Sequence, residues 1–377
     1  MSIKVTHVYR TYFPDPPGGL QEAIRQIALG VQAHGVENTV FALSPRPMPG
    51  VLIRPEARVL RSRSWLAPAS CDLGGVDAFT RFACCARETD VLHYLFPWPF
   101  ADVLHAVLRP DKPAVMTYIS DVVRQRWLGT LYSSLMWKTL RKMKVIVATS
   151  PNYARTSPVL NHADVRSKVR VIPHGIDERS YPAQSDDTVF GRLGLELGEP
   201  YFLFLGVLRY YKGLEYLIQA APAVRAKVII AGDGPEGRRL RAGAARGGAS
   251  NVIFAGYVSD AEKVALLRGC LALVLPSHLR SEAFGMVLVE AAIYGKPQIS
   301  CEIGTGTSYV NAHGESGFVV PPRDSVALAA AMTRLLREEG LAEELGAGAR
   351  ARYERLFSGV AVGRAYAQLF GELARAG

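Results

Sequence analysis

Residues 277–292 read SHLRSEAFGMVLVEAA, and this stretch decides the fold of the chain. The apolar run that precedes it, Leu271 to Leu275, predicts a buried strand of a parallel sheet. Ser281 is a candidate N-cap for the following helix, which we expect over Gly285 to Tyr294. That helix is apolar nearly all round, so the pattern predicts a buried helix at the centre of an α/β domain.

Two carboxylates, Glu282 and Glu290, interrupt this apolar unit. An ionised carboxylate in a buried helix is costly unless donors meet it, so we expect Glu290 to bind polar groups. Glu282 lies at the strand-to-helix turn, where ligands bind at the carboxyl edge of a parallel sheet. The backbone N–H groups around Phe284, Gly285 and Met286 open the helix and predict an anion site. Carboxylates on both sides of a phosphate cradle predict a ligand with hydroxyls and phosphates, such as a sugar nucleotide.

The composition is that of a globular protein, with 49% hydrophobic and 21% charged residues. A chain of 377 residues exceeds what one core usually supports, so we expect two domains. No apolar run is long enough to span a membrane, and Met1 to Val5 looks like the start of a strand rather than a signal peptide. The five cysteines are odd in number and lack metal-ligand spacing, which predicts reduced thiols in the cytoplasm.

Strand-like runs alternate with helical patterns through the first half, which predicts a parallel, doubly wound sheet. These runs are 3–9, 38–42, 91–96, 114–118, 145–148 and 169–172. Periodicity is lost over 181–200, which predicts an interdomain linker. The alternation restarts at Tyr201, and the chain ends in expected helices at 324–337, 340–355 and 358–375. The sequence therefore predicts two similar α/β halves that face one another across a cleft, the usual place for a ligand.

Two cations, Arg209 and Lys212, follow the first strand of the second half and precede a helix. Cations at a helix N-terminus oppose the macrodipole by roughly 0.3–1 kcal/mol each, and a bound anion removes this conflict. We therefore expect Arg209 to form a forked contact with a phosphate, and Lys212 to act as a point charge. A solvated pair on a basic surface is the alternative.

Three glycine-rich turns are further candidates, each with a purely structural alternative. Gly18 and Gly19 allow a ligand to approach the backbone at a helix start, or form only a tight turn. Residues 232–237 match G-x-G-x-x-G, but the acidic residue expected about 20 residues on is absent, which favours a structural turn lining the cleft. Residues 304–308, GTGTS, supply hydroxyls to a pyrophosphate or sugar, or form a hydrogen-bonded loop.

The net charge of +10 predicts an anionic partner, such as a nucleotide sugar, a nucleic acid or an anionic membrane. Residues 122–144 hold six basic residues, no acidic one, and the interleaved Trp127 and Trp137. Such a segment is typical of peripheral contact with an anionic membrane, and a sheet-covering helix with a solvated basic edge is the alternative. No recognised module accompanies the charge, so we do not expect nucleic-acid binding. The absence of a D-x-D motif and of metal-ligand spacing predicts no metal ion and no cofactor.

Together these residues resemble the retaining GT-B glycosyltransferases of family four. Glu282 to Glu290 matches that family's E-x7-E element, and further motifs follow the family's order along nearly the whole chain. These motifs are Gly18-Gly19, Pro173-His174-Gly175-Ile176-Asp177, Arg209 with Lys212, and Gly232-Asp233-Gly234. Within the family, the chain looks most similar to bacterial O-antigen and exopolysaccharide mannosyl- or rhamnosyltransferases.

The resemblance implies a GT-B fold of two Rossmann-like domains, residues 1–182 and 199–357, with the C-terminal helix 358–377 packing back on the first. Catalytic roles are implied for three residues: Arg209 and Lys212 would stabilise the leaving diphosphate, and Glu282 would contact the sugar. Glu290 would bind the ribose hydroxyls. The remaining donor-binding positions that the resemblance implies are Gly18, Gly19, Asp121, Gly234, Val258, Lys263, Phe284, Gly285 and Met286, with Val258 and Lys263 near the base.

The chain departs from the family at Ile119 and Leu95, where its members commonly carry histidine. The resemblance implies that both positions face the donor sugar. Two apolar side chains there imply a less hydroxylated donor, such as a 6-deoxy sugar, or weaker activity.

We therefore expect a retaining transferase that moves a mannosyl or rhamnosyl unit from a nucleotide diphosphate sugar, GDP-linked. No carboxylate is placed as a glycosyl nucleophile, which favours attack on the same face of the sugar. The implied acceptor is a lipid-linked glycan in lipopolysaccharide or exopolysaccharide synthesis, reached by a cytoplasmic enzyme bound peripherally to the inner membrane through residues 122–144. A nucleotide-sugar epimerase and a non-catalytic sugar-nucleotide-binding subunit are the alternatives.

Overall fold

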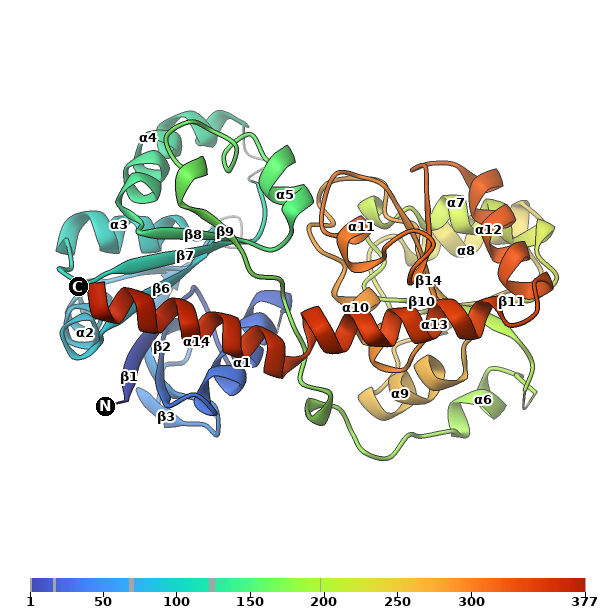
Figure 1. The fold of residues 1–377 in the computed structure, drawn as a ribbon, viewed down its shortest axis with the longest axis horizontal. Coiled ribbons are helices and arrows are strands. Elements are labelled where there is room, and N and C mark those ends of the chain that lie inside the picture. The colour runs from blue at the N-terminus through green and yellow to red at the C-terminus, as the bar shows by residue number, and fades with distance from the viewer. Residues whose placement is uncertain (1, 16–17, 68–70, 122–125, 197, 377) are drawn as a thin grey trace. The chain divides into compact units, whose positions relative to one another are not determined.

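The computed structural model describes residues 2–15, 18–67, 71–121, 126–196 and 198–376. The chain divides into two compact units (Figure 1). The first comprises Met1–Gly175 together with Gly359–Gly377, and the second comprises Ile176–Ser358.

The first unit is built on one sheet whose strands follow the order β3-β4-β2-β1-β6-β7-β8-β9, with β5 paired to β4. The pairing is parallel except for β3 and β5, which run antiparallel to β4. The strand bounds are β1 Ile3–Val8, β2 Val36–Ser44, β3 Val51–Ile53, β4 Arg58–Leu66, β5 Leu73–Gly74, β6 Val91–Phe96, β7 Ala114–Tyr118, β8 Val145–Ala148 and β9 Val169–Val171. The structure confirms the expected parallel, doubly wound sheet.

Helices cover both faces of this sheet. They are α1 Gly19–Gln32, α2 Val76–Glu88, α3 Pro99–Leu108, α4 Arg126–Lys142, α5 Pro151–Thr156 and α14 Gly359–Ala376. Helices α1 and α14 lie side by side (Figure 1), because Gly30 and Gly363 let their backbones meet. A Cβ added to Gly363 would lie 2.4 Å from the Gly30 carbonyl oxygen, so no larger residue fits there without movement. The C-terminal helix is therefore an integral part of the first unit.

A chain of buried polar groups runs through the first unit and ends on α14. The two Nδ1 atoms of His7 and His93 lie 2.8 Å apart, and His93 Nε2 lies 2.7 Å from the Thr117 hydroxyl. That hydroxyl is 2.9 Å from the hydroxyl of Tyr366. Burial lowers the pKa of His7 to about 4 and holds the pKa of His93 well below its ordinary value. Both imidazoles are therefore neutral near pH 7, as an uncharged hydrogen-bonded chain requires.

Strands β3, β4 and β5 were not expected from the sequence. Three arginines break the apolar pattern of β4, yet Arg61 is buried, with only 4% of its surface exposed. Its guanidinium donates to the Ser44 hydroxyl at 2.7 Å and lies 3.5 Å from a carboxylate oxygen of Asp15. These partners are distant in the sequence, so the burial of an arginine in β4 could not be read from the local pattern.

The second unit carries one parallel sheet in the order β12-β11-β10-β13-β14-β15. The strands are β10 Tyr201–Leu205, β11 Lys227–Ala231, β12 Val252–Gly256, β13 Ala272–Leu275, β14 Gln298–Cys301 and β15 Gly317–Val320. The α-helices are α6 Thr188–Arg192, α7 Leu214–Ala220, α8 Gly237–Arg246, α9 Asp260–Gly269, α10 Met286–Ile293, α11 Thr307–Val310, α12 Ser325–Arg337 and α13 Leu341–Arg352. From β10 the order runs through β11 and β12 on one side and through β13, β14 and β15 on the other.

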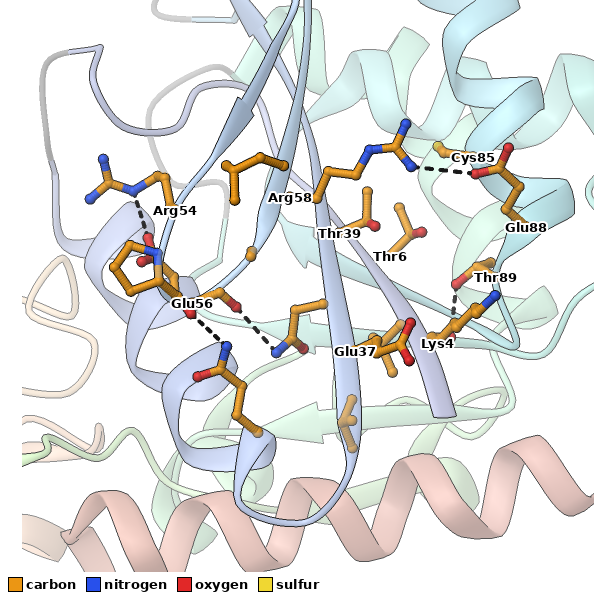
Figure 2. A pocket seen from close by; sticks show the side chains of 17 residues that line it. Lys4, Thr6, Glu37, Thr39, Arg54, Glu56, Arg58, Cys85, Glu88 and Thr89 are labelled. Carbon is orange, nitrogen blue, oxygen red and sulfur yellow. Dashed lines mark hydrogen bonds and ion pairs between the residues drawn. The ribbon is translucent and has the colours of Figure 1, made fainter. Parts of the chain in front are cut away.

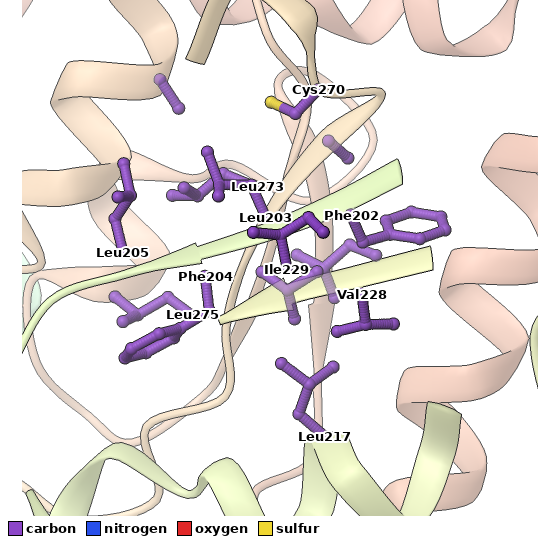
Figure 3. Packing of buried hydrophobic residues seen from close by; sticks show 14 of the residues in the cluster. Phe202, Leu203, Phe204, Leu205, Leu217, Val228, Ile229, Cys270, Leu273 and Leu275 are labelled. Carbon is purple, nitrogen blue, oxygen red and sulfur yellow. The ribbon is translucent and has the colours of Figure 1, made fainter. Parts of the chain in front are cut away.

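The centre of this unit is the apolar core around β10 (Figure 3). Phe202 and Phe204 are fully buried between side chains of β11 and β13, such as Val228 and Leu275. Residues 181–200, expected as a linker, instead belong to the second unit and contribute α6 and the buried Val189. Because this segment is short and poorly periodic, its packing was not visible in the sequence pattern.

Helix α10 begins later than expected. It starts at Met286 behind Gly285, whose φ of 86° and ψ of 56° are left-handed, and no side chain caps it. The prediction of Ser281 as the N-cap was therefore wrong. A left-handed residue is cheapest as glycine, so the chain turns into the helix at Gly285.

Candidate active site

The candidate site lies at the carboxyl edge of the second sheet, where the strand order changes direction between β10 and β13. Two loops leave this edge, 206–213 after β10 and 276–285 after β13. They pack closely: the Tyr211 carbonyl accepts the His278 N–H at 3.0 Å. Gly213 adopts φ 67°, and a Cβ there would lie 2.1 Å from the Pro276 carbonyl oxygen. Such a switch point is where open α/β sheets bind their ligands.

Lys212 and Glu282 form a buried ion pair that joins these two loops. Their Nζ and Oε2 atoms lie 2.5 Å apart, and only 13% and 11% of the two side chains are exposed. The Ser277 hydroxyl donates to the same carboxylate oxygen at 3.2 Å. Burial acts to lower the pKa of Lys212, but the Glu282 carboxylate, together with Tyr211 and Glu290, raises that pKa above its ordinary value. Lys212 is therefore a permanent cation at the switch point.

Glu290 sits in a second polar cluster on α10. Its Oε1 accepts a hydrogen bond from the Tyr181 hydroxyl at 2.5 Å and lies 3.3 Å from Lys263 Nζ. Lys263 also pairs with Asp260 at 3.2 Å and lies 4.6 Å from the Tyr181 ring centroid. The Glu290 carboxylate also raises the pKa of Lys212, although less than Glu282 does, so the two clusters share one electrostatic neighbourhood.

Sequence reasoning predicted Lys263 and Glu290 but missed Tyr181. The tyrosine stands in the stretch that looked like a linker, and no local pattern there indicates a contact with Glu290 in α10. Its ring and hydroxyl could be found only from the folded unit.

Arg209 is placed differently from Lys212. It is an exposed residue at the start of the 3₁₀ turn Tyr210–Lys212, and its guanidinium makes no hydrogen bond or ion pair with the part of the chain that the structure describes. The structure therefore brings Lys212 together with Glu282 and leaves Arg209 open to solvent on the same loop.

The glycine turn after β11 serves close packing of the two neighbouring loops. Gly232 adopts φ 131°, and a Cβ there would lie 2.1 Å from the Gly206 carbonyl oxygen. A Cβ on Gly234 would lie 2.6 Å from the Leu208 carbonyl oxygen. Val258 follows β12 and is half-buried, packed against the unit's core.

The start of α10 is held by the loop after β14. Gly306 donates its N–H to the Ala283 carbonyl at 2.9 Å, and Thr305 donates its hydroxyl to the Glu282 carbonyl at 2.7 Å. The Thr305 hydroxyl therefore makes an internal hydrogen bond, which agrees with the alternative that residues 304–308 form a hydrogen-bonded loop. Phe284 is buried at 4% exposure, and Met286 opens the helix, where first-turn N–H groups lack intrahelical acceptors.

Three predicted donor-binding residues belong to the first unit. Gly18 is the extended N-cap of α1, and Gly19 is its first residue. Asp121 follows β7, and its Oδ1 accepts hydrogen bonds from Tyr118 at 3.1 Å and from Ser157 at 2.6 Å. These contacts give Asp121 a structural role at the carboxyl edge of the first sheet.

The two positions where the chain departs from the family are also in the first unit. Leu95 lies in β6 with 1% of its surface exposed, and Ile119 directly follows β7 with 8% exposed. Both are therefore buried apolar side chains near the carboxyl ends of adjacent strands.

The basic segment 122–144 is described only in part. Arg124 lies outside the described residues, as do the side chains of Arg126 and Trp127. The exposed cations of its C-terminal end are Lys138, Arg141, Lys142 and Lys144. Trp137 packs on His162 with ring centroids 4.5 Å apart.

A cavity of about 460 Å³ lies elsewhere in the first unit, near the amino ends of β1, β2 and β4 (Figure 2). Its charges are largely paired, with Arg54 2.7 Å from Glu56 and Arg58 3.7 Å from Glu88. None of the predicted site residues lines it, so we place the functional site at the carboxyl edge of the second sheet instead.

Comparison with known proteins shows that the chain belongs to the glycosyltransferases. Residues 17–180 match the family described as Glycosyltransferase Family 4, and residues 185–352 match Glycosyl transferases group 1. The chain is 45% identical to the D-rhamnosyltransferase WbpZ of Pseudomonas aeruginosa, over 94% of this chain and 92% of that protein. It is 39% identical to the O-antigen chain mannosyltransferase C of Escherichia coli, over 98% of each.

Solved structures show the same GT-B fold. The sucrose-phosphate synthase of Thermosynechococcus elongatus superposes with a TM-score of 0.79 at 22% identity, covering 100% of both chains. Anabaena HepE in complex with UDP and glucose gives 0.77 at 19% identity, covering 98% of this chain and 100% of that one. Among the described residues, no helix is both long and apolar enough to cross a membrane.

Proposed function

We propose that this protein transfers a rhamnosyl or mannosyl unit from a GDP-linked sugar to a lipid-linked glycan during O-antigen synthesis, with retention at the anomeric carbon. The observation that carries the proposal is the buried Lys212–Glu282 pair at the switch point of the second sheet, 2.5 Å across. It places a fixed cation and a carboxylate side by side, where a sugar diphosphate needs both.

The cations of loop 206–213 suit a diphosphate. Lys212 has three N–H donors, and Glu282 accepts one of them, which leaves donors for phosphate oxygens. Arg209 is exposed on the same loop and can form a forked contact with a phosphate. The first turn of α10, behind Gly285, adds backbone N–H groups with a favourable dipole.

The carboxylates suit the hydroxyls of the ligand. Glu282 is held by Lys212 and Ser277, and takes the role of a sugar-hydroxyl acceptor. Glu290 is oriented by Tyr181 and Lys263, and binds ribose hydroxyls with its remaining acceptor capacity. Lys263 lies on the α9 side of this cluster and, with Val258, borders the base.

The sugar is proposed from two independent observations. The two most similar relatives described above are named a D-rhamnosyltransferase and a mannosyltransferase. Leu95 and Ile119 supply apolar side chains where family members commonly carry histidine, and a 6-deoxy sugar presents a methyl group in place of one hydroxyl. We therefore place GDP-rhamnose first and GDP-mannose second.

The mechanism follows from where charge develops. The bond from the anomeric carbon to the diphosphate oxygen breaks as the acceptor oxygen attacks from the same face. The leaving diphosphate gains negative charge, which Lys212, Arg209 and the start of α10 stabilise from fixed positions. The acceptor proton passes to a diphosphate oxygen. In this proposal the cations of the protein take the place of a divalent ion, so EDTA leaves the rate unchanged.

The acceptor and its location complete the proposal. A lipid-linked glycan is held at the cytoplasmic face of the inner membrane, and a peripheral enzyme must bind that surface to reach it. The exposed cations of residues 138–144 supply a positive contribution to such binding.

The test is incubation with GDP-rhamnose or GDP-mannose and a lipid-linked acceptor, with NMR of the product. We expect transfer with retained anomeric configuration, and nucleotide binding that falls more than about tenfold in Lys212→Met, since each 1.4 kcal/mol is a factor of ten. Inversion would refute the mechanism. Donor turnover without acceptor would indicate an epimerase, and tight donor binding without any transfer would indicate a non-catalytic subunit.

A further inference from the structure

Strand β4 projects beyond the carboxyl edge of the first sheet. Ser44, the last residue of β2, pairs with Arg63, but β4 continues to Leu66 against the short strand β5. The side chains at this projecting end are exposed, with 60% of Trp65 and 67% of Leu66 open to solvent.

A third exposed apolar residue adjoins these two. Val76, 83% exposed, opens α2 directly after Gly75. The Trp65 indole lies against that glycine, since a Cβ on Gly75 would be 2.7 Å from Trp65 Nε1. We call Trp65, Leu66 and Val76 the β4 tip. Single exposed apolar residues are ordinary on a protein surface, but two consecutive ones at a projecting strand end, beside a third at the start of the adjoining helix, favour an interaction site.

Three exposed arginines lie on the elements that carry the β4 tip or in the turn after β2: Arg63, Arg81 and Arg46. The Arg63 guanidinium lies 4.5 Å from the Trp65 ring centroid. Arg81 is exposed on α2 and donates to the Gly50 carbonyl at 3.3 Å, in the turn that also carries the exposed Arg46. Two carboxylates lie close by: Asp77 accepts the backbone N–H of Arg63 at 3.1 Å, and the buried Asp72 accepts the Ser64 hydroxyl at 2.8 Å. An indole beside arginines and aliphatic side chains is the composition of segments that lie at a membrane-water interface.

We infer that the β4 tip inserts into the interfacial layer of an anionic bilayer, with the neighbouring arginines on lipid phosphates. The inference rests on the proposed function, because a lipid-linked acceptor is held at such a surface. The position of the tip supports it: ligands of parallel sheets bind at the carboxyl edge, and the tip projects from that edge of the first sheet.

The tip differs in place from the basic segment predicted to bind the membrane. Lys144, just after α4, donates its N–H to the carbonyl of Ala114, the first residue of β7. The cations of residues 138–144 therefore lead to the amino edge of the sheet, whereas the tip lies at the carboxyl edge. Variants of the two regions separate their contributions.

The experiment is cosedimentation of the full chain with vesicles of phosphatidylcholine and phosphatidylglycerol, without donor or acceptor. We expect Trp65→Ser/Leu66→Ser to lower partitioning more than about tenfold, because each side chain removes on the order of 100 Å² of apolar surface from water on insertion. Arg63→Gln lowers it about fivefold at low salt. Val326→Ser, at a still more exposed apolar site in the second unit with 79% of its surface open to solvent, leaves partitioning unchanged.

Three results would overturn the inference. In the first, Trp65→Ser/Leu66→Ser binds vesicles as tightly as the wild type. In the second, only the triple variant Arg141→Ser/Lys142→Ser/Lys144→Ser loses vesicle binding. In the third, the wild type does not bind anionic vesicles and forms dimers through Trp65 in sedimentation velocity. Nucleotide affinity, measured separately on the same variants, stays at the wild-type value. If the protein binds vesicles but no nucleotide, the inference about the β4 tip stands and the proposed function is refuted.

Discussion

Breaking the Lys212–Glu282 pair from one side should destabilise the second unit. With the atoms 2.5 Å apart, Coulomb's law at an effective dielectric constant of 20 gives an attraction of about 7 kcal/mol, offset largely by desolvation. Removing one partner leaves an uncompensated buried charge, which costs roughly 3–5 kcal/mol. We expect Lys212→Met and Glu282→Leu each to lower the free energy of unfolding by about 3 kcal/mol, and the double variant to lie within about 1 kcal/mol of the wild type.

The assay must report on the second unit. The four tryptophans, at positions 65, 98, 127 and 137, all belong to the first unit, so their fluorescence does not serve. Hydrogen exchange of the β10 and β13 amides measures the opening of the second sheet directly. The matched control is Lys227→Met: Lys227 pairs with Glu199 at 2.8 Å in the same unit, but the two side chains are 28% and 30% exposed. Its loss should cost under about 1 kcal/mol.

Additive effects would refute this reasoning. If the double variant loses the sum of the two single losses, the pair has no coupling energy and Lys212 is not fixed by Glu282. If Lys212→Met is as stable as the wild type, Lys212 is likewise not fixed by Glu282. The lysine would then be a solvated side chain, and its role as a prepositioned phosphate ligand would fall.

Three further predictions concern other parts of the chain. Gly213→Ala should destabilise the second unit by more than about 2 kcal/mol in thermal unfolding and abolish nucleotide binding, because the new Cβ would lie 2.1 Å from the Pro276 carbonyl oxygen at φ 67°. Burial raises the pKa of Asp102 to about 7, so the folded protein holds this side chain as the neutral acid. The contribution of Asp102 to the free energy of unfolding is therefore complete below about pH 4 and is lost as the pH rises through 7. Asp102→Asn should remove this fall, which amounts to about 1.4 kcal/mol per pH unit across the window, as followed by urea unfolding at stepped pH. Tyr366→Phe, which deletes the 2.9 Å contact with the Thr117 hydroxyl, should cost about 1 kcal/mol and speed hydrogen exchange in α14; unchanged exchange would show that the contact contributes nothing.

The elements with regular apolar periodicity were predictable from the sequence. The strand at 272–275 and the helix that follows it were expected within a few residues, because a buried strand and a buried helix impose unmistakable apolar runs. Strand β4 was missed because Arg61 interrupts its pattern, and what buries that arginine is Ser44 and Asp15 from other elements. Helix α10 was given the wrong cap, because a left-handed glycine at 285 and a serine cap at 281 look equally acceptable in sequence.

The candidate site was predictable as a place but not as a set of contacts. The chain order alone places Lys212 and Glu282 after strands that end at one edge of the sheet. Which carboxylate meets which cation depends on the close packing of loops 206–213 and 276–285, and that is a tertiary property. Tyr181 illustrates the limit, since a residue 109 positions from Glu290 carries no local sign of that contact.

The acidic side chains Glu282 and Glu290 also determine which anions the site binds weakly. Glu282 cancels the charge of Lys212, and Glu290 cancels that of Lys263, before any ligand arrives. Arg209 is then the uncompensated cation of loop 206–213, and one cation alone holds a free inorganic phosphate only weakly. Tight binding requires a ligand that brings hydroxyl donors for the two carboxylates together with its phosphates. The two carboxylates therefore make the site selective for whole nucleotide sugars.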